Sequence, residues 1–366
     1  MKPMDEISSC TVMIVDDTET NIDILVEALG SDFNLQVTMD GESALKAIAY
    51  KMPDLILLDI MMPGMDGYEV CRRLKASPET RGIPIVFLTA MSEEQDEARG
   101  LALGAVDYIT KPFSPPLVKA RVRNQLELKR YRDHLEDLVR ERTRQLALTQ
   151  EVTLQSMGTL AEYRDPETGG HIRRTQEYIR ILAEHLKDHP RFRDRLNDTA
   201  IELLVKSAPL HDIGKVGVRD NILLKPDELT EEEFETMKRH TTYGRDMLLI
   251  SEKMLGGDSF LSMAREIAYT HQEKWDGTGY PRGLKGEEIP ISGRLMAVAD
   301  VYDALISKRI YKPPYPHDTA VAIILEERGS HFDPDVVDAF LKLADAFKKI
   351  ALEHADFEEE RALLSA

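Results

Sequence analysis

The sequence predicts a multidomain protein, in which an α/β doubly wound domain with a five-stranded parallel sheet is followed by an all-α domain. Short apolar runs alternate with amphipathic stretches five times in the first third of the chain, a pattern typical of a parallel sheet with helices on both faces. Strand patterns fade after residue 158 and helical periodicity dominates. A long helix is expected to join the two domains.

Composition restricts the class of function. The chain has 366 residues, a length that suits two to three domains, and 42% of them are hydrophobic, which suffices for packed cores. The formal net charge of −18 disfavours a general role in binding DNA or membrane surfaces, since phosphate groups are bound by clustered Lys and Arg. No apolar run approaches the roughly 18 residues of a membrane-spanning helix.

The cysteines and the N-terminal segment predict a cytoplasmic location. Cys10 and Cys71 each lie in an apolar context without metal-type spacing, as expected of buried thiols in a reducing compartment. The segment MKPMDEISSC contains acids where a signal peptide would need an apolar stretch.

The first domain is expected over residues 8–125. Its five predicted strands are Thr11–Val15, Leu35–Met39, Leu55–Leu58, Ile85–Leu88 and Val106–Ile109. Helical patterns follow the successive strands at 21–29, 42–50, 67–75, 93–103 and from 115 onward. In this architecture the carboxyl ends of the strands form the binding site.

Residues that suit phosphate chemistry occur at successive strand ends. Asp16 and Asp17 end the first strand, and Asp59 ends the third. Three acids meeting at one sheet edge would repel one another unless a divalent cation held them, and Mg²⁺ prefers such oxygen ligands. Asp59 is then a candidate nucleophile toward a phosphoryl donor, with Thr89 and Lys111 placed to bind the product phosphate. The alternative is that each acid is a solvated loop residue.

Four motifs in this domain resemble the receiver domain of bacterial response regulators. They are VDD at 15–17, DIMMPGMDG at 59–67, LTA at 88–90 and YITKPF at 108–113. The resemblance covers about residues 10–125. It implies that a sensor histidine kinase supplies a phosphoryl group and that Asp59 accepts it.

The resemblance also implies which groups surround the phosphoacceptor. Mg²⁺ would bind Asp16, Asp17 and Asp59, together with the main-chain carbonyl of Met61. The switch residues of the family correspond to Thr89, Tyr108 and Lys111. The Lys111–Pro112 bond is expected to be cis, which would aim the ammonium at the phosphate.

Residues 117–157 contain neither glycine nor proline, which predicts one long helix. The apolar residues Leu128, Tyr131, Leu135 and Leu138 alternate in spacings of three and four with charges between them, as in a coiled coil. The segment is interpreted as a signalling helix that forms a homodimer. The alternative is a single helix that lies on its own domain.

The second domain is expected over residues 155–350, followed by an acidic tail at 351–366. Its predicted helices are 173–185, 198–210, 231–240, 243–250, 260–271, 295–305, 319–328 and 334–353. Thr230 and Glu233 form the capping-box pattern that marks the start of one of them.

Four of the ten histidines, together with two aspartates, predict a metal site. The other six are interpreted as solvated or turn residues: His134, His185, His189, His317, His331 and His354. His211 and Asp212 adjoin each other after an apolar stretch, and Asp212 could bridge two ions. Asp300 lies on a largely apolar helix, where an unpaired carboxylate is costly. The remaining candidates are His171, His240, His271 and Glu167. Such mixed ligands favour Mn, Fe or Zn over Ca²⁺.

These residues lie in motifs that resemble the HD-GYP family of metal phosphohydrolases. The motifs are RDPETGGHIRR at 164–174, HDIGKVGVRD at 211–220, LLKPDELTEEEFETMKRH at 223–240, HQEKWDGTGYPRGLKGEEIP at 271–290 and VADVYDALISKRIYK at 298–312. The resemblance spans about residues 155–345. Active members of this family hydrolyse cyclic di-GMP to linear pGpG, GMP or both.

This resemblance implies a role for each candidate residue. One metal ion would be bound by His171, His211, Asp212 and Asp300. Asp212 would bridge to a second ion, whose other ligands are His240 and His271. Lys215 would contact the scissile phosphate, so that Lys215 and Asp212 carry the catalysis. The substrate contacts would be Tyr280, Arg309 and Lys312, although a solvated basic cluster would also explain the last two.

One departure from the family bears on the metal count. The family reads His-His-Glu where this chain has His271, Gln272 and Glu273, and an amide oxygen is a weak ligand for a transition metal. In members that hold three ions, the positions of Glu167 and Gln272 both contribute. The sequence therefore predicts two divalent ions, Fe or Mn in preference to Ni or Zn.

The combined prediction is a response regulator in which phosphorylation of Asp59 controls a metal-dependent cyclic di-GMP phosphodiesterase. Two alternatives stay open. The first is an inactive or weakly active effector that binds cyclic di-GMP, which Gln272 favours. The second is a phosphodiesterase that prefers pGpG, since the same residues would serve it.

Overall fold

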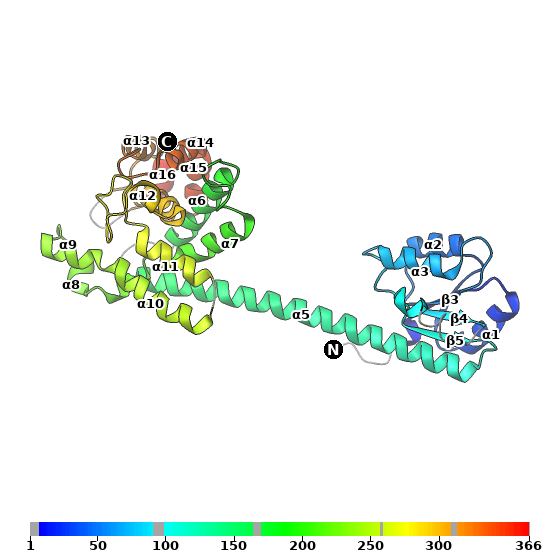
Figure 1. Cartoon of the computed structure of the whole chain (residues 1–366). Coiled ribbons are helices and arrows are strands. Elements are labelled where there is room, and N and C mark those ends of the chain that lie inside the picture. Colours follow the sequence, from blue (N-terminus) through cyan, green and yellow to red (C-terminus); the bar gives the residue numbers. More distant parts are fainter. Residues whose placement is uncertain (1–6, 91–98, 164–169, 257–258, 309–312, 366) are drawn as a thin grey trace. The chain divides into compact units, whose positions relative to one another are not determined.

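The structure is a computed structural model that describes residues 7–90, 99–163, 170–256, 259–308 and 313–365. It divides into two compact units, Met1–Arg144 and Gln145–Ala366, and each is described by itself (Figure 1). Three candidate site residues, Glu167, Arg309 and Lys312, lie outside the described residues, as does part of the helix expected at 93–103.

The first unit contains a five-stranded parallel sheet in the order β2-β1-β3-β4-β5. The strands are β1 (Thr11–Val15), β2 (Asn34–Thr38), β3 (Leu55–Asp59), β4 (Ile85–Thr89) and β5 (Asp107–Thr110). The three central strands β1, β3 and β4 are buried along their whole length, as their continuous apolar runs predict. The five predicted strands are therefore confirmed, each to within one residue at its ends.

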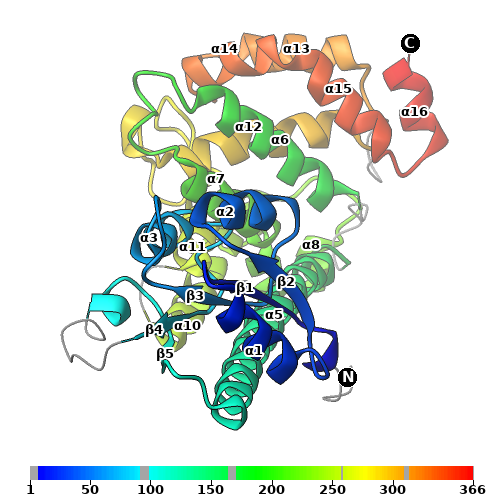
Figure 2. The same ribbon diagram turned by 90° about the vertical axis from the view of Figure 1, so that its right-hand side faces the viewer.

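Helices cover both faces of this sheet (Figure 2). On one face, α2 (Gly41–Tyr50) and α3 (Gly67–Ala76) pack against alternate strand side chains such as Met13. On the other face, α1 (Glu19–Leu29) and the first part of α5 (Pro115–Tyr163) pack against the intervening ones, such as Ile14. Successive strand side chains point to opposite faces, so each central strand contributes to both cores. Cys10 and Cys71 are both buried free thiols.

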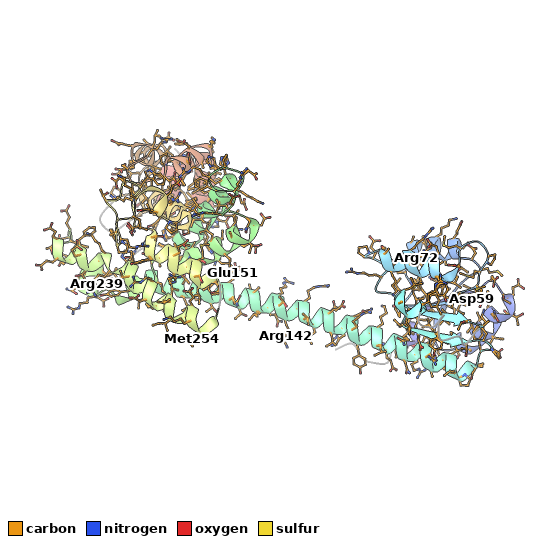
Figure 3. The ribbon with its side chains drawn as sticks, viewed as in Figure 1. Asp59, Arg72, Arg142, Glu151, Arg239 and Met254 are labelled. Atoms are coloured by element: carbon orange, nitrogen blue, oxygen red, sulfur yellow. The ribbon has the colours of Figure 1, made fainter. Side chains whose placement is uncertain are left out.

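Helix α5 has 49 residues and includes the whole segment predicted as a linker helix. Its first turns bury Val118, Val122 and Leu126 against the sheet. The four residues with coiled-coil spacing are exposed in the chain, with relative accessibilities of 61% for Leu128, 53% for Tyr131, 57% for Leu135 and 43% for Leu138. Arg142 and Glu151 follow farther along the same helix (Figure 3).

The second unit contains helices joined by loops, and its described residues form no strand apart from one isolated bridge. Besides the end of α5, its helices are α6 (His171–Leu186), α7 (Asp198–Ser207), α8 (Asp220–Leu223), α9 (Glu231–Lys238), α10 (His240–Leu255), α11 (Phe260–Thr270), α12 (Ile291–Ile306), α13 (His317–Glu326), α14 (Pro334–Lys342), α15 (Ala344–Glu353) and α16 (Glu358–Ser365). None of the described helices is long and apolar enough to cross a membrane.

An aromatic cluster fixes α6 and α12, the two helices that carry His171 and Asp300. Tyr178 of α6 stacks on Phe347 with a ring separation of 4.4 Å, and Tyr302 of α12 meets the same ring edge-on at 5.2 Å. All three side chains are fully buried. Burial of such large rings stabilises the packing that places the two helices side by side.

Several predicted boundaries differ from the structure for identifiable reasons. The helix expected at 198–210 ends at Ser207, and a short 3₁₀ turn, η2 (Ala208–Leu210), contains Pro209, which has no N–H to continue an α-helix. The helix expected at 334–353 is divided at Leu343 into α14 and α15. The segment 351–366, expected as an acidic tail, holds the end of α15 and the helix α16, which buries Leu364.

One histidine was interpreted wrongly. His317, expected to be solvated, is only 6% exposed, and its Nδ1 lies 2.8 Å from the hydroxyl of Tyr302. Charged neighbours in the sequence suggested a surface position. At the start of α13, however, the His317 ring turns inward against α12, and the neighbouring residues in the sequence give no sign of this contact.

Candidate functional site

The strand ends of the first unit gather the predicted acids. One oxygen from each of Asp16, Asp17 and Asp59 lies within 4.8 Å of the others. The Nζ of Lys111 is 2.9 Å from Asp16 Oδ2 and 2.9 Å from Asp59 Oδ2. Burial raises the pKa of Asp59, the Lys111 ammonium opposes this, and Asp16 adds to it. Such a cluster of acids therefore requires a cation to neutralise its charge, and Mg²⁺ suits the oxygen donors.

Local structure holds these acids in place. The Asp16 carboxylate accepts hydrogen bonds from the main-chain N–H of Thr18 and from the side-chain amide of Asn21, at 3.0 and 2.9 Å. Gly67 begins α3 directly against the end of β3, where a Cβ atom would lie 2.2 Å from the main-chain oxygen of Asp59. Sequence reasoning missed Asn21, whose only signal is its position in the first turn of the helix after Asp17.

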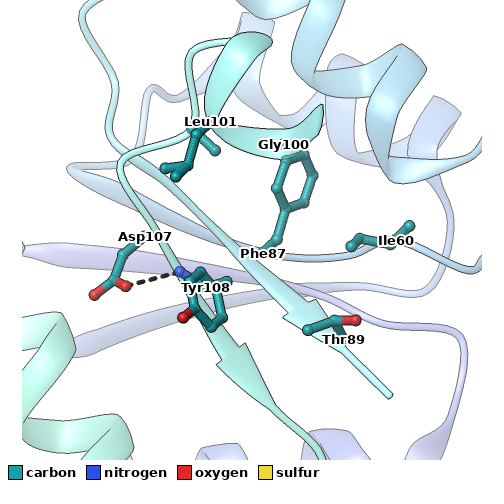
Figure 4. Close-up of a pocket in the computed structure, with 8 residues that line it drawn as sticks. Ile60, Phe87, Thr89, Gly100, Leu101, Asp107 and Tyr108 are labelled. Carbon is teal, nitrogen blue, oxygen red and sulfur yellow. Dashed lines mark hydrogen bonds between the residues drawn. The ribbon is translucent and has the colours of Figure 1, made fainter. Parts of the chain in front are cut away.

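Of the residues assigned to the switch, Lys111 contacts the acids directly, and Thr89 and Tyr108 lie on β4 and β5. Thr89 ends β4 and is buried, while Tyr108 lies on the neighbouring strand β5. Both line one small cavity together with Phe87 and Leu101 (Figure 4). The Lys111–Pro112 peptide bond is cis, as expected.

The second unit brings six predicted ligands together from five places in the chain. His171 begins α6, His211 and Asp212 follow η2, and His240 begins α10. His271 follows α11, and Asp300 lies within α12. Two groups result: the first is His171, His211 and Asp300, and the second is Asp212, His240 and His271.

The two groups meet at Asp212. Its Oδ2 lies 3.3 Å from His211 Nε2, a member of the first group. Its Oδ1 lies 3.4 Å from His240 Nε2 and 3.4 Å from His271 Nε2, both in the second group. In the first group, Asp300 Oδ1 is 3.7 Å from His171 Nε2. The carboxylate of Asp212 can therefore serve both groups at once.

The histidine rings are fixed from behind, so that their Nε2 atoms converge. The Nδ1 atoms of His211, His240 and His271 lie 3.0, 2.8 and 3.1 Å from main-chain oxygens of the preceding turn. Each Nδ1 can then donate its proton to a carbonyl, which leaves the Nε2 lone pair for a cation. The Nδ1 of His171 instead faces a side chain, Asp303, at 2.8 Å.

Close backbone approach makes this convergence possible at one glycine. Gly214 lies in the short 3₁₀ helix η3 (Ile213–Gly217), and a Cβ atom there would lie 1.9 Å from the main-chain oxygen of His240. Only glycine allows η3 to lie this close to the start of α10. The Asp212 and His240 side chains can consequently reach each other across the two elements.

The protonation states of Asp212 and His240 suit divalent metal ions, whereas Asp212 and Asp300 raise the pKa of His211 despite its burial. Burial alone would raise the pKa of Asp212, but Lys215 and His211 hold it well below its usual range, so the carboxylate is charged. Burial lowers the pKa of His240 to about 4, so this imidazole is neutral. The buried Oδ1 of Asp212 and Nε2 of His211 have no hydrogen-bond partner among the described residues. Charged carboxylate and neutral imidazole are the forms that bind metal.

Two further candidates lie at the edge of the metal-binding groups. The Nζ of Lys215 is 2.7 Å from Asp212 Oδ2. The ring of Tyr280 is half-buried and lies 6.3 Å from that of His240. Burial raises the pKa of Tyr280 well above its usual range, and Asp212 and Asp300 add to the shift. Gln272 is half-buried, and its main-chain oxygen accepts the N–H of Tyr280 at 3.1 Å.

Sequence reasoning missed three residues that support the site. Arg174 and Asp303 form a buried pair behind His171, with Arg174 Nε 2.6 Å from Asp303 Oδ1. Glu273 is 2% exposed, and its carboxylate accepts the main-chain N–H groups of Arg282 and Leu284 at 2.8 and 2.9 Å, which shapes the loop around Tyr280. All three lie inside the recognised motifs, but their partners cannot be inferred from spacing alone.

Comparison with known proteins identifies one protein family in each part of the chain. Residues 12–123 match the response regulator receiver domain, and residues 155–336 match the HD domain. A probable cyclic di-GMP phosphodiesterase of Vibrio cholerae is 48% identical over 99% of this chain and 83% of its own length. The cyclic di-GMP phosphodiesterase response regulator RpfG of Xanthomonas campestris is 36% identical over 90% of this chain and 87% of its own.

A third relative matches about half of the chain. It is a 3'3'-cGAMP-specific phosphodiesterase of Vibrio cholerae, 40% identical over 52% of this chain and 34% of its own length. The first two relatives, by contrast, match this chain across both domains. The chain therefore belongs to the family of two-component response regulators in which a receiver domain is followed by an HD domain of the HD-GYP type.

Proposed function

We propose that this protein is a response regulator whose HD-GYP domain hydrolyses cyclic di-GMP to pGpG, GMP or both, controlled by phosphorylation of Asp59. The observation that carries the proposal is the position of Asp212 between two ligand groups. One of its oxygens faces His211, and the other faces His240 and His271. A carboxylate in this position suits a pair of cations, the arrangement that many phosphodiester hydrolases use.

The donor set favours Fe or Mn, with Ni or Zn as alternatives, because imidazole and carboxylate ligands are combined. Divalent ions bound here would stabilise the negative charge that develops on the phosphoryl group and would lower the pKa of a coordinated water. We expect two such ions per chain. In the receiver domain, Asp16, Asp17 and Asp59 would hold Mg²⁺.

The chain's own residues bind and orient the substrate. The Lys215 ammonium, 2.7 Å from Asp212, is close enough to the ligand groups to contact a non-bridging oxygen of the scissile phosphate. Tyr280 lines the same region with its ring. Arg309 and Lys312 are the proposed contacts to the other phosphate. These cations form a local anion site even though the chain as a whole carries a net charge of −18.

The receiver domain takes its phosphoryl group from a sensor histidine kinase. An oxygen of Asp59 bonds to phosphorus as the phosphorus–nitrogen bond of the donor breaks. Lys111, already paired with Asp16 and Asp59, neutralises part of the added charge. We propose that the resulting change in the receiver reaches the HD-GYP domain through α5 in a homodimer.

The test of the hydrolytic activity uses three substrates. Metal-loaded full-length protein is incubated with cyclic di-GMP, pGpG or 3'3'-cGAMP, and the products are separated over time. We expect slow loss of cyclic di-GMP, with no loss in the Asp212→Ala variant. Faster consumption of pGpG would favour the pGpG-specific alternative. Consumption of 3'3'-cGAMP alone would contradict the proposed substrate.

The alternative of a non-hydrolytic effector rests on Gln272, which replaces a histidine of the family pattern. Tight binding of cyclic di-GMP without any product would support it. The same residue underlies the proposed metal count, because an amide oxygen is a weak ligand. Metal content per chain after anaerobic purification tests this count. Two ions are expected, and three tightly bound ions would contradict it.

A further inference from the structure

Asp303 contacts the Nδ1 side of the His171 ring. Its Oδ2 lies 2.8 Å from His171 Nδ1, whereas the other three histidines of the metal site face main-chain oxygens. Asp300 and Asp303 are three residues apart on α12, so one helix meets both sides of the imidazole. Asp300 faces its Nε2, at 3.7 Å, and Asp303 faces its Nδ1.

Arg174 fixes the orientation of Asp303. The guanidinium donates from Nε to Oδ1 at 2.6 Å and from Nη2 to Oδ2 at 2.9 Å, a two-pronged contact that allows one carboxylate orientation. Both side chains are 1% exposed. A second donation from Nη2 reaches the Ser307 hydroxyl at 3.0 Å. His171 and Arg174 lie one turn apart on α6, so the pair links α6 to α12 directly behind the metal ligand.

The C-terminal segment supplies the remaining contacts of Arg174. Its Nη1 donates to the main-chain oxygen of His354 at 2.8 Å and to Asp356 Oδ2 at 3.0 Å. The same Asp356 oxygen accepts the main-chain N–H of Gly170 at 3.2 Å. A Cβ atom on Gly170 would lie 2.7 Å from the main-chain oxygen of His354 and 2.4 Å from Arg174 Nη1, so this approach requires glycine.

Glu360 holds the C-terminal segment in this position. The residue is 2% exposed. Its carboxylate accepts the main-chain N–H groups of Asp356 at 3.1 Å and Lys308 at 2.8 Å. The connection between α15 and α16 is thereby tied to the residues that follow α12.

We infer that Asp303 is a positioning residue for the metal ligand His171, and that Arg174 and the C-terminal segment at Asp356 hold Asp303 in the orientation this requires. The inference rests on the proposed metal-dependent function. Asp303 accepts a hydrogen bond from Nδ1–H of His171 and so keeps the Nε2 lone pair directed toward the first ligand group, which contains Asp300 and His211. The segment 354–360 thus belongs to the structure of the metal site.

Stability alone does not account for this buried cluster. Desolvation of a buried ion pair offsets much of its Coulombic attraction, so apolar side chains of similar size would stabilise the fold equally well. A ligand imidazole, in contrast, donates its other N–H to an acceptor that sets its tautomer, and a carboxylate acceptor also increases its basicity. The contact between Asp303 and His171 meets this need.

Metal binding by the full-length chain tests the inference. Zn²⁺ is titrated into metal-free wild type, Asp303→Asn and Asp356→Asn, with a chromophoric chelator as competitor. We expect Asp303→Asn to lower the affinity for one of the two ions about 10-fold to 100-fold and to leave the affinity for the other unchanged. Asp356→Asn should lower the affinity for the same ion to a smaller extent, because an amide oxygen is a weaker acceptor for Arg174 than a carboxylate. Glu358→Gln, an exposed carboxyl change in the same segment, is the matched control and should change neither ion.

A second measurement distinguishes positioning from a purely structural role. In histidine-labelled, metal-free chain, two-bond ¹H–¹⁵N correlations should identify His171 as the Nδ1–H tautomer. The Nδ1 proton resonance should move upfield in Asp303→Asn and stay in place in Glu358→Gln. Unchanged metal affinities in Asp303→Asn, or equal weakening of both ions, would overturn the inference. If Asp303→Asn does not fold, Asp356→Asn and Arg174→Lys decide by the same criteria.

These outcomes are separate from those of the proposed function. Suppose that the wild type hydrolyses none of the dinucleotides, while Asp303→Asn selectively loses one metal ion. This result would refute the phosphodiesterase activity and leave the positioning role of Asp303 intact. Hydrolysis of cyclic di-GMP by the wild type, together with unchanged metal binding in Asp303→Asn, would support the phosphodiesterase and refute the positioning role.

Discussion

At the scale of single residues, the chemistry proposed for the second unit depends on the two carboxylate oxygens of Asp212, which are shared between the two ligand groups. Asp212 faces different histidines with its two oxygens, and one of these oxygens also contacts Lys215. A positive side chain next to the bridging carboxylate reduces the repulsion that an incoming phosphate would meet. The ammonium is therefore assigned to the substrate, while the imidazoles are assigned to the metals.

This assignment predicts different consequences for the two kinds of residue. Lys215→Ala should lower kcat for cyclic di-GMP about 100-fold, the usual loss when one donor to a developing oxyanion is removed. Its two metal ions should stay bound, because the change removes no ligand. Steady-state kinetics and metal analysis on the same preparation check both points. Lys206→Ala, on the exposed side of α7, should retain full activity; loss of metal in Lys215→Ala would contradict the assignment.

His331 predicts a pH dependence of stability. Burial lowers its pKa to about 4, and Lys274 adds to this effect, whereas an unfolded histidine titrates near 6.5. Between these values the unfolded chain binds a proton that the folded chain does not, so stability is lost as the pH falls from about 6.5 to 4. The loss is at most about 3 kcal/mol.

Calorimetry of the metal-free chain measures this dependence. The Tm of the helical domain should fall less between pH 7.5 and 4.5 in His331→Gln than in wild type. His134→Gln, at an exposed position of α5, should behave like wild type. Equal decreases in Tm for wild type and His331→Gln would show that His331 does not contribute to the pH dependence of stability.

At the scale of secondary-structure elements, α5 presents an apolar stripe that the described residues of its own chain do not cover. Leu128, Tyr131, Leu135 and Leu138 all lie between 43% and 61% exposed. Their spacing matches the seam of a coiled coil. A second α5 is the partner that this pattern favours, and dimerisation stays a prediction.

The stripe can be tested by one substitution. Leu135→Lys should raise the dimer dissociation constant about 100-fold, because each of two buried leucines contributes about 1.5 kcal/mol or more. Light scattering over a concentration series measures the change. Glu136→Lys introduces the same side chain at the next position, away from the stripe, and should leave the dimer intact. A wild type that is monomeric at all concentrations would refute the interface.

The contact between η3 and α10 is a second prediction at this scale. Gly214→Ala places a Cβ atom 1.9 Å from the main-chain oxygen of His240, so the two elements must separate. We expect loss of one metal ion and a free energy of unfolding lowered by about 1–3 kcal/mol. Metal analysis and urea unfolding report the two effects. Gly82→Ala, whose Cβ has no neighbour nearer than 3.9 Å, is the control and should change neither.

At the scale of the whole molecule, two domains of different class share one chain and one continuous helix. The receiver carries a buried aspartate beside a lysine, and the HD-GYP domain carries the paired ligand groups. Regulation requires that a phosphoryl group on Asp59 favours one of two states of the molecule. The domain order places α5 between the modified residue and the metal site.

Beryllofluoride, a phosphoryl mimic, tests this coupling in the full-length chain. With Mg²⁺ present, it should change the rate of cyclic di-GMP hydrolysis or the dimer content, by a factor that activity assays and light scattering can measure. Asp59→Ala should abolish the change while keeping the basal activity. If the mimic changes neither property, control through Asp59 is refuted.

Much of this architecture could be predicted because it depends on local patterns. The five strands are continuous apolar runs, and a central parallel strand needs little else to be recognised. Helix ends were less predictable. Pro209, which has no N–H, follows the early end of α7. The apparent helix at 334–353 is divided at Leu343, which its helical periodicity did not predict.

The sequence by itself determined the two domain classes and, through its motifs, named the candidate metal ligands, because periodicity and motifs are properties of the chain order. Only the tertiary structure decided how the ligands are shared and supported. The contact between Arg174 and Asp356 spans 182 positions, and the contact between His171 and Asp303 spans 132. Contacts between residues so distant leave no periodic signal in the chain. They form only when α6, α12 and the C-terminal segment pack together around the buried aromatic core.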